Sequence, residues 1–190
     1  MSLLAPPLSH LRRVARSTDG VVTIEFTIIF PIFMFIFLMI VESGVMSLRQ
    51  VMLEHGTEVA VRDVRLGRIT NSDSAEFQLA VKERICGEAT MIPDCMAQLQ
   101  IEMLRRSPRA FTALPADIPC VDRSQTVQPS VTFTTAGNND LMFLRVCARV
   151  DALFPTTGIG RAIVEQNDGD AAGGSLALIS EAAFVVEPFQ

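Results

Sequence analysis

The sequence predicts an α+β protein in which one long N-terminal helix packs on a small, mostly antiparallel sheet. Two patterns support this prediction. Residues 21–66 combine a long apolar run with a following segment of helical periodicity, and the second half of the chain contains short strand-like segments separated by proline and glycine. With 190 residues, the chain has room for one globular domain plus appendages.

Residues 21–41 are predicted to form a transmembrane helix. The segment is apolar except for Thr23, Thr27 and Glu25, and it contains five phenylalanines. As a helix it would extend roughly 31 Å, which matches the hydrocarbon core of a bilayer. A cleaved secretory signal has a shorter apolar region and a small-residue cleavage site, and residues 40–44 match such a site poorly. Pro31 lacks a backbone N–H, so we expect a helix kink there.

The charges that flank the span predict its orientation. The leader, residues 1–20, carries Arg12, Arg13 and Arg16, and the positive-inside rule keeps such a basic segment in the cytoplasm. Everything after the span is then expected on the external side, with Glu42 as the outer boundary of the span.

Four cysteines, all on the predicted external side, are expected to form two disulfides, because external compartments are oxidising. Nearest-neighbour pairing of Cys86 with Cys95 and of Cys120 with Cys147 is favoured, since each bridge would join a short loop to an adjacent element. The other two pairings remain open. A metal site is not expected, because C-x-x-C spacing and histidine partners are missing.

The helical pattern is predicted to continue beyond the membrane, so that one helix covers about residues 22–66. Residues 42–67 alternate apolar and charged positions at a spacing of three to four, which is typical of an amphipathic helix packed on a domain. Gly67 is expected to end the helix. The apolar positions are Leu48, Met52, Val59, Val61, Val64 and Leu66.

The rest of the chain, residues 68–190, is predicted to be an external α+β domain stapled by the disulfides. A second amphipathic helix is expected over residues 75–86. Prolines indicate a long loop over residues 105–129, and residues 156–174 are expected to be irregular. Strands are predicted at residues 98–103, 130–135, 141–151 and 177–187.

The junction between leader and span carries a specific pattern. Residues 19–26 read Asp-Gly-Val-Val-Thr-Ile-Glu-Phe, so a glycine closes the basic leader and a glutamate follows five residues later, with an aromatic residue next to it. This resembles a prepilin cleavage region. More narrowly, about residues 13–67 resemble the TadE/TadF-like minor pseudopilins of the tight-adherence (Flp-type) pilus system. Major Flp-type pilins are very short and carry Glu-Tyr at the junction. This chain instead has Glu25-Phe26 and a sizeable external domain, which favours a minor component.

The resemblance implies a pilin-like fold and a mechanism. A prepilin peptidase would cut between Gly20 and Val21, and Glu25, with Phe26 beside it, would pair with the new amino terminus of a neighbouring subunit. A nearby cationic amine relieves the penalty on a buried carboxylate. The implied partners are the membrane, the prepilin peptidase, other pilins and pseudopilins, and the pilus assembly platform. The chain would lie in the bacterial inner membrane with its C-terminal domain periplasmic, and it would act in assembly or initiation of a Tad/Flp-type adhesion pilus.

An enzyme is not expected. The motifs G-x-S-x-G, H-E-x-x-H and C-x-x-C are missing, and the two histidines, His10 and His55, lie outside the predicted globular part. No cofactor is implied, and the formal net charge of −5 gives no reason to propose nucleic-acid binding. Two alternatives remain: an uncleaved single-pass scaffold or binding module of an envelope secretion complex, and a membrane-tethered enzyme.

Overall fold

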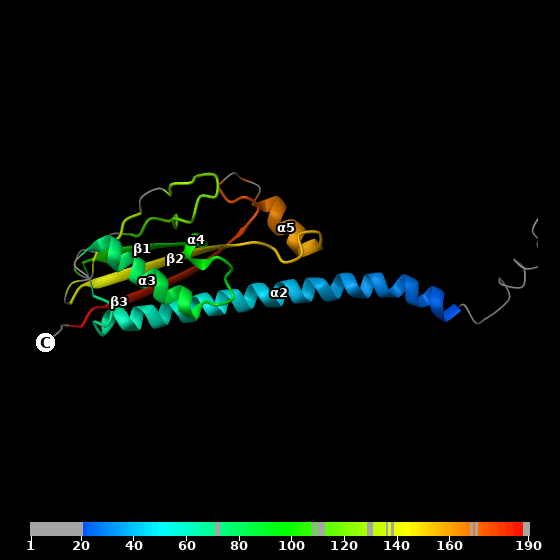
Figure 1. Ribbon diagram of the computed structural model, residues 1–190, viewed down its shortest axis with the longest axis horizontal. Helices are drawn as coiled ribbons and strands as arrows, with labels where there is room; N and C mark the ends of the chain where they lie inside the picture. Colours follow the sequence, from blue (N-terminus) through cyan, green and yellow to red (C-terminus); the bar gives the residue numbers. More distant parts are fainter. Residues whose placement is uncertain are drawn as a thin grey trace, which may run out of the picture. The chain divides into compact units, whose positions relative to one another are not determined.

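The computed structural model describes residues 21–70, 73–107, 109, 113–128, 131–135, 137, 139–167, 169 and 171–187. The chain divides into two units, residues 1–38 and residues 39–190. Helix α2 (Val21–Arg65) is long and contributes its beginning to the first unit and its remainder to the second (Figure 1). This continuous helix agrees with the one predicted from the sequence.

The described part of the first unit is the apolar beginning of α2. Its large side chains are exposed, and the rings of Phe26 and Phe30 stack with their centroids 5.0 Å apart. Pro31 lies inside the helix. Among the described residues, α2 is the one helix long and apolar enough to cross a membrane by length and composition, with a mean hydropathy of 2.6 over a window that is not buried.

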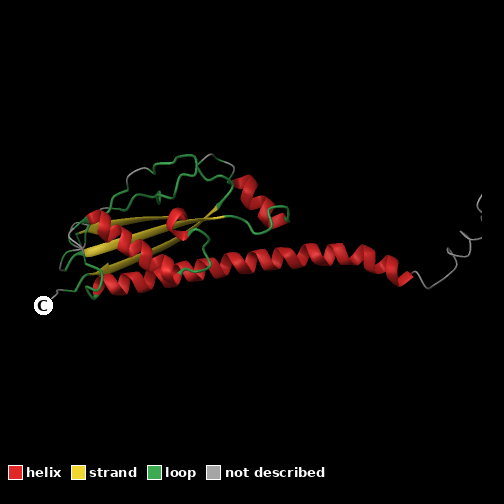
Figure 2. Ribbon diagram, viewed as in Figure 1, coloured by secondary structure: helices red, strands yellow, loops and turns green. Residues whose placement is uncertain are grey.

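The second unit is built on a three-stranded antiparallel sheet of order β1-β2-β3 (Figure 2). Strand β1 (Leu99–Arg106) pairs with β2 (Leu141–Val150), and β2 pairs with β3 (Leu176–Val185). Because side chains alternate between the two faces of a strand, every second residue of each strand enters the core. The α+β prediction is therefore confirmed. The buried side chains of this face include Leu99, Ile101, Met103, Met142, Leu144, Val146, Ala148, Val150, Leu178 and Phe184.

Helices α2 and α3 (Ser74–Glu88) cover this apolar face of the sheet. Leu53 of α2 and Val81 and Ile85 of α3 are fully buried in the same core cluster as the strand residues. An added Cβ at Gly56 would lie 2.7 Å from the backbone oxygen of Ile85. The two helices are therefore so close at this point that only glycine fits between them.

The buried face of α2 differs from the one predicted. Leu48 and Leu66 were expected on the packed side, but they are 46% and 44% exposed. Burial instead follows positions spaced alternately four and three residues apart, which is the spacing that keeps one helix face toward a partner. Several of these positions are polar or glycine, so a pattern based on apolar residues alone does not reveal them. The buried positions at this spacing are Glu42, Met46, Arg49, Leu53, Gly56, Ala60 and Asp63. Thr57 and Val64 are buried as well, and Val64 is one of the predicted apolar positions.

An ion-pair network joins the end of α2 to α3. Asp63 accepts hydrogen bonds from Arg84 Nε at 2.7 Å and from Arg68 Nη1 at 3.2 Å, and Arg84 also donates to Glu88 at 2.7 Å. After Arg65, the N–H of Gly67 donates to Val64 O and the N–H of Arg68 donates to Asp63 O. Gly67 has a φ of 66°, which suits this Schellman-type ending, and the predicted helix end is confirmed.

Two disulfides join neighbouring elements of the second unit. Cys86 of α3 is bonded to Cys95, the first residue of the short helix α4 (Cys95–Gln98). Cys120, in the β1–β2 connection, is bonded to Cys147 of β2 and so holds that connection to the sheet. These are the nearest-neighbour pairs favoured by the sequence.

Two predictions for the external part are wrong. Residues 156–174 were expected to be irregular, but they contain helix α5 (Gly158–Gln166), whose N-cap Thr157 accepts a hydrogen bond from the N–H of Gly160. A strand was expected at residues 130–135, but within its described part only an isolated bridge joins Phe133 to Met103 of β1. This bridge consists of two hydrogen bonds, from the N–H of Met103 to Thr132 O at 3.1 Å and from the N–H of Thr134 to Met103 O at 3.0 Å.

Gly56→Ala is expected to destabilise the second unit by about 1–3 kcal/mol, because the added methyl group would force the helices apart despite the better helix propensity of alanine. The matched control is Gly87→Ala in α3, where an added Cβ meets nothing within 4 Å. That change should be neutral or slightly stabilising. The chain lacks tryptophan and tyrosine, so unfolding is followed by far-UV circular dichroism. Equal midpoints for the two variants would contradict the close approach.

Asp63→Asn is expected to lower the unfolding temperature in a pH-dependent way. The hydrogen bond from Arg84 holds the pKa of Asp63 below its usual value. The fold therefore favours the carboxylate, and its contribution is complete above the ordinary aspartate pKa of about 3.9 and is lost as the pH falls through the lowered value. The difference between the wild type and Asp63→Asn should shrink below about pH 4. Asp117→Asn, at an exposed position, is the control, and a difference independent of pH would contradict this account.

Candidate functional site

The predicted cleavage and pairing residues lie at the start of α2. Gly20, the predicted cleavage residue, lies outside the described residues, and the helix begins at Val21. Glu25 lies one helical turn further on and is exposed, and within the described part of the chain it has no hydrogen bond or ion pair. Its neighbour Phe26 is 61% exposed. A single carboxylate is thus carried on an otherwise apolar helix surface.

Within the described part of the first unit, no other segment packs on this surface. The exposed side chains occupy all sides of the helix, so packing against a single neighbouring element would not bury them. An exposed apolar area of this extent marks a surface that contacts lipid or another protein. The exposed residues include Val22, Ile24, Ile28, Ile29, Ile32, Phe33 and Ile36.

Glu42 has a role that the sequence analysis did not predict. It was expected to mark the outer boundary of the span, but it is fully buried. Its Oε1 accepts a hydrogen bond from the N–H of Leu153 at 2.8 Å, and its Oε2 accepts one from the N–H of Phe154 at 2.7 Å. Hydrogen bonds from two consecutive backbone amides satisfy the carboxylate, which offsets the cost of its burial.

A second contact from α2 holds the same loop. Arg49, two helical turns after Glu42, donates from Nη1 to the backbone oxygen of Asp151 at 2.9 Å. The loop then leads into α5, and Gly160 packs so closely on it that an added Cβ would lie only 2.8 Å from the carbonyl carbon of Phe154. The loop between β2 and α5 is therefore fixed both to α2 and to the first turn of α5.

The signal that could have revealed Glu42 is a spacing of seven. Glu42, Arg49, Gly56 and Asp63 recur at that interval, and each makes a specific contact with another segment of the second unit. A search for apolar periodicity passes over these residues because none of them is apolar. Among the described residues, no group of three or more His, Cys, Asp or Glu is arranged to hold a metal ion.

A long N-terminal apolar helix whose continuation packs on an antiparallel sheet is a pilin-like arrangement. The family model described as TadE-like protein matches residues 20–62, from the predicted cleavage residue to the last turn of α2. The chain is therefore similar to TadE-like proteins over this segment, which confirms the family resemblance found in the sequence. No curated protein and no solved structure matches the chain.

Glu42→Gln is expected to destabilise the second unit by about 2–3 kcal/mol, because the charge is lost and the new amide N–H₂ faces a backbone donor. Hydrogen exchange at the amides of Leu153 and Phe154 should accelerate, and this local readout separates the clamp from a general loss of stability. Glu58→Gln, at an exposed position on the same helix, is the matched control. Unchanged protection of both amides in Glu42→Gln would rule out the role assigned to this carboxylate.

Proposed function

We propose that the protein is a minor pseudopilin that acts in assembly or initiation of a Tad/Flp-type adhesion pilus, and that a prepilin peptidase processes it between Gly20 and Val21. The observation that carries this proposal is the TadE-like match over residues 20–62, which begins at the predicted cleavage residue. The matched segment includes the start of α2, where large apolar side chains are exposed and Glu25 is the one carboxylate.

Cleavage would create a cationic partner for Glu25, which has none among the described residues. A cut after Gly20 leaves an α-amino group at Val21, at the N-terminal end of α2, and removes the basic leader. In an environment of lipid and apolar side chains, a carboxylate without a counter-charge is costly. The amino group of a neighbouring subunit would offset that cost, so pairing would select one axial register while apolar side chains such as Phe26 supply the contact area.

The charge balance supports removal of the leader before assembly. Removing residues 1–20 takes away three arginines and one aspartate, which leaves 13 basic and 20 acidic residues and a formal net charge of −7. The basic leader holds the N-terminus on the cytoplasmic side during insertion, and its loss frees the helix end for assembly. In this proposal residues 21–41 span the bacterial inner membrane, and the two disulfides of the second unit lie in the oxidising periplasm.

The proposed partners are the prepilin peptidase, other pilins and pseudopilins, and the pilus assembly platform. The peptidase supplies the catalysis, so the chain itself needs no active site. The predicted division into a leader (1–20), a transmembrane helix (21–41), an amphipathic extension (42–67) and a periplasmic domain (68–190) forms part of the proposal.

Processing is tested by intact mass and N-terminal sequencing of the full chain, expressed with and without its cognate prepilin peptidase. We expect a mature chain that starts at Val21 only when the peptidase is present. Gly20→Leu should abolish the cut, because a large side chain would not fit a site selective for glycine. A chain that keeps residues 1–20 under both conditions would contradict the proposal and favour the uncleaved membrane-anchored scaffold.

Glu25→Gln separates cleavage from assembly. The substitution keeps the shape of the side chain and removes its charge, so we expect a processed chain that no longer co-purifies with its pilin partners. Glu58→Gln, further along α2 and exposed in the second unit, is the charge-matched control and should retain partner binding. Normal co-purification of processed Glu25→Gln would show that charge pairing does not select the subunit register.

A further inference from the structure

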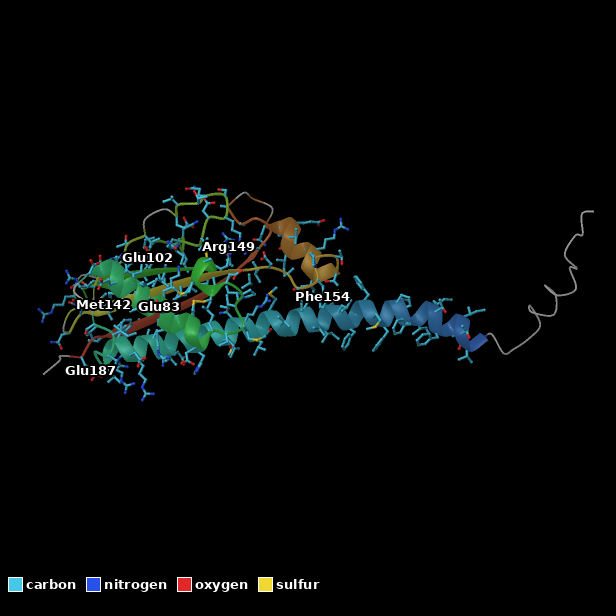
Figure 3. The ribbon with its side chains drawn as sticks, in the orientation of Figure 1. Glu83, Glu102, Met142, Arg149, Phe154 and Glu187 are labelled. Atoms are coloured by element: carbon cyan, nitrogen blue, oxygen red, sulfur yellow. A yellow bond between two sulfur atoms is a disulfide. The ribbon has the colours of Figure 1, made fainter. Side chains whose placement is uncertain are left out.

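A cavity of about 170 Å³ lies in the second unit beside the loop that Glu42 and Arg49 hold. Three arginines line it: Arg49 from α2, Arg123 from the β1–β2 connection and Arg149 from β2. Arg149 lies at the end of β2 that leads toward Phe154 (Figure 3). Like charges held this close are unfavourable unless anions neutralise them.

Arg123 is neutralised within the chain. It donates to the carboxylate of Asp151 from Nη1 at 2.5 Å and from Nη2 at 3.3 Å, and its Nε donates to Gln98 Oε1 at 3.1 Å. Asp151 is therefore already engaged. The other carboxylate on the cavity wall belongs to Asp94, whose side chain is exposed.

The other two arginines retain unused donors. Arg149 has no hydrogen bond or ion pair among the described residues, and its Nε is buried without a partner. Burial and the neighbouring charge of Arg123 lower the pKa of Arg149. Arg49 is only 8% exposed, and its Nε likewise lacks a partner within the described part of the chain, although its Nη1 holds Asp151. Asp122 lies close enough to Arg149 to favour its charged form, but it makes no hydrogen bond or ion pair with it among the described residues. The cavity thus offers guanidinium hydrogens of Arg49 and Arg149 that have no partner within the described part of the chain.

We propose that this cavity binds the phosphate group of a membrane phospholipid. The planar guanidinium fork matches phosphate oxygens, and about 170 Å³ is room for such a group together with water. Guanidinium nitrogens that are covered in the unliganded protein would reach the phosphate by rotation of the arginine side chains, which are long and flexible.

The position of the cavity along α2 favours lipid as the source of the phosphate. This step rests on the proposed function, in which the span ends near Val41. Glu42 directly follows Val41 and holds the N–H of Leu153 on the cavity wall, so this part of the wall lies where the span ends, next to the headgroup layer. Arg49 lies about 12 Å of helix rise beyond Val41, and helical side chains lean back toward the N-terminal end of the helix. Leu153 lines the same cavity and is 45% exposed, so it offers apolar surface beside the cationic one.

The test uses the full chain in dodecyl maltoside, a detergent without phosphate. Unfolding is followed by circular dichroism during titration with dioctanoyl phosphatidylglycerol, with dioctanoylglycerol as the phosphate-free lipid and with inorganic phosphate at constant ionic strength. We expect a saturable rise in unfolding temperature with the phospholipid and none with dioctanoylglycerol. Inorganic phosphate should act at the same site but only at higher concentration.

Arg149→Gln is the decisive variant, because this side chain has no hydrogen bond or ion pair in the described fold that its loss would break. It should weaken the apparent affinity for the phospholipid about tenfold or more, and Arg149→Lys should give an intermediate value. Arg161→Gln is the matched control, since Arg161 is exposed on α5 and paired with Glu165. It should titrate like the wild type.

Three outcomes would overturn the inference in different ways. Equal titrations of the wild type and Arg149→Gln would exclude the site, and so would an equal response to dioctanoylglycerol. Inorganic phosphate that stabilises at the same concentration as the phospholipid would overturn the lipid source. The N-terminus of the same preparations is read by mass, so that a failure of processing after Gly20 is scored separately from a failure of lipid binding.

Discussion

The second unit depends on one face of α2, along which buried positions alternate at spacings of four and three. The apolar members enter the core between α3 and the sheet, and the polar or glycine members each hold a different segment. Glu42 and Arg49 hold the loop after β2. Gly56 allows the backbone of α3 to approach closely, and Asp63 binds Arg84 of α3. A single helix face therefore covers the sheet and positions the segments around it. The apolar members are Met46, Leu53 and Ala60.

Glu25 and Glu42, both in α2, differ in how the cost of a carboxylate in apolar surroundings is offset. A carboxylate among apolar side chains needs hydrogen-bond donors or a cation. Glu42 receives two backbone N–H groups from its own chain and is thereby part of the fold. Glu25 has no such partner among the described residues, so the compensating charge is proposed to come from another subunit. This contrast separates a residue that stabilises the domain from one that would select its neighbours.

The proposed phosphate site and the proposed pairing site share this logic. In both, a charged side chain, Glu25 or Arg149, has no hydrogen bond or ion pair within the described chain, and in both proposals the environment is lipid or its headgroups. Arg49 links the two features, because the same side chain holds the loop through Asp151 and lines the cavity. The disulfides restrain the connections within the second unit.

Local patterns in the sequence were sufficient for the long helix, its end at Gly67, the second helix, three of the four predicted strands and the TadE-like junction, because apolar periodicity and glycine act over a few residues. The tertiary structure decided what depends on distant partners. Glu42 became a buried clamp because Leu153 and Phe154 present two amides to it. Gly56 became a helix contact because Ile85 approaches it. Arg149 has a buried Nε without a partner among the described residues, while Arg123 binds Asp151. Local sequence patterns determined most of the helices and strands, although not α5, whereas long-range packing determined which polar side chains find a partner within the described chain.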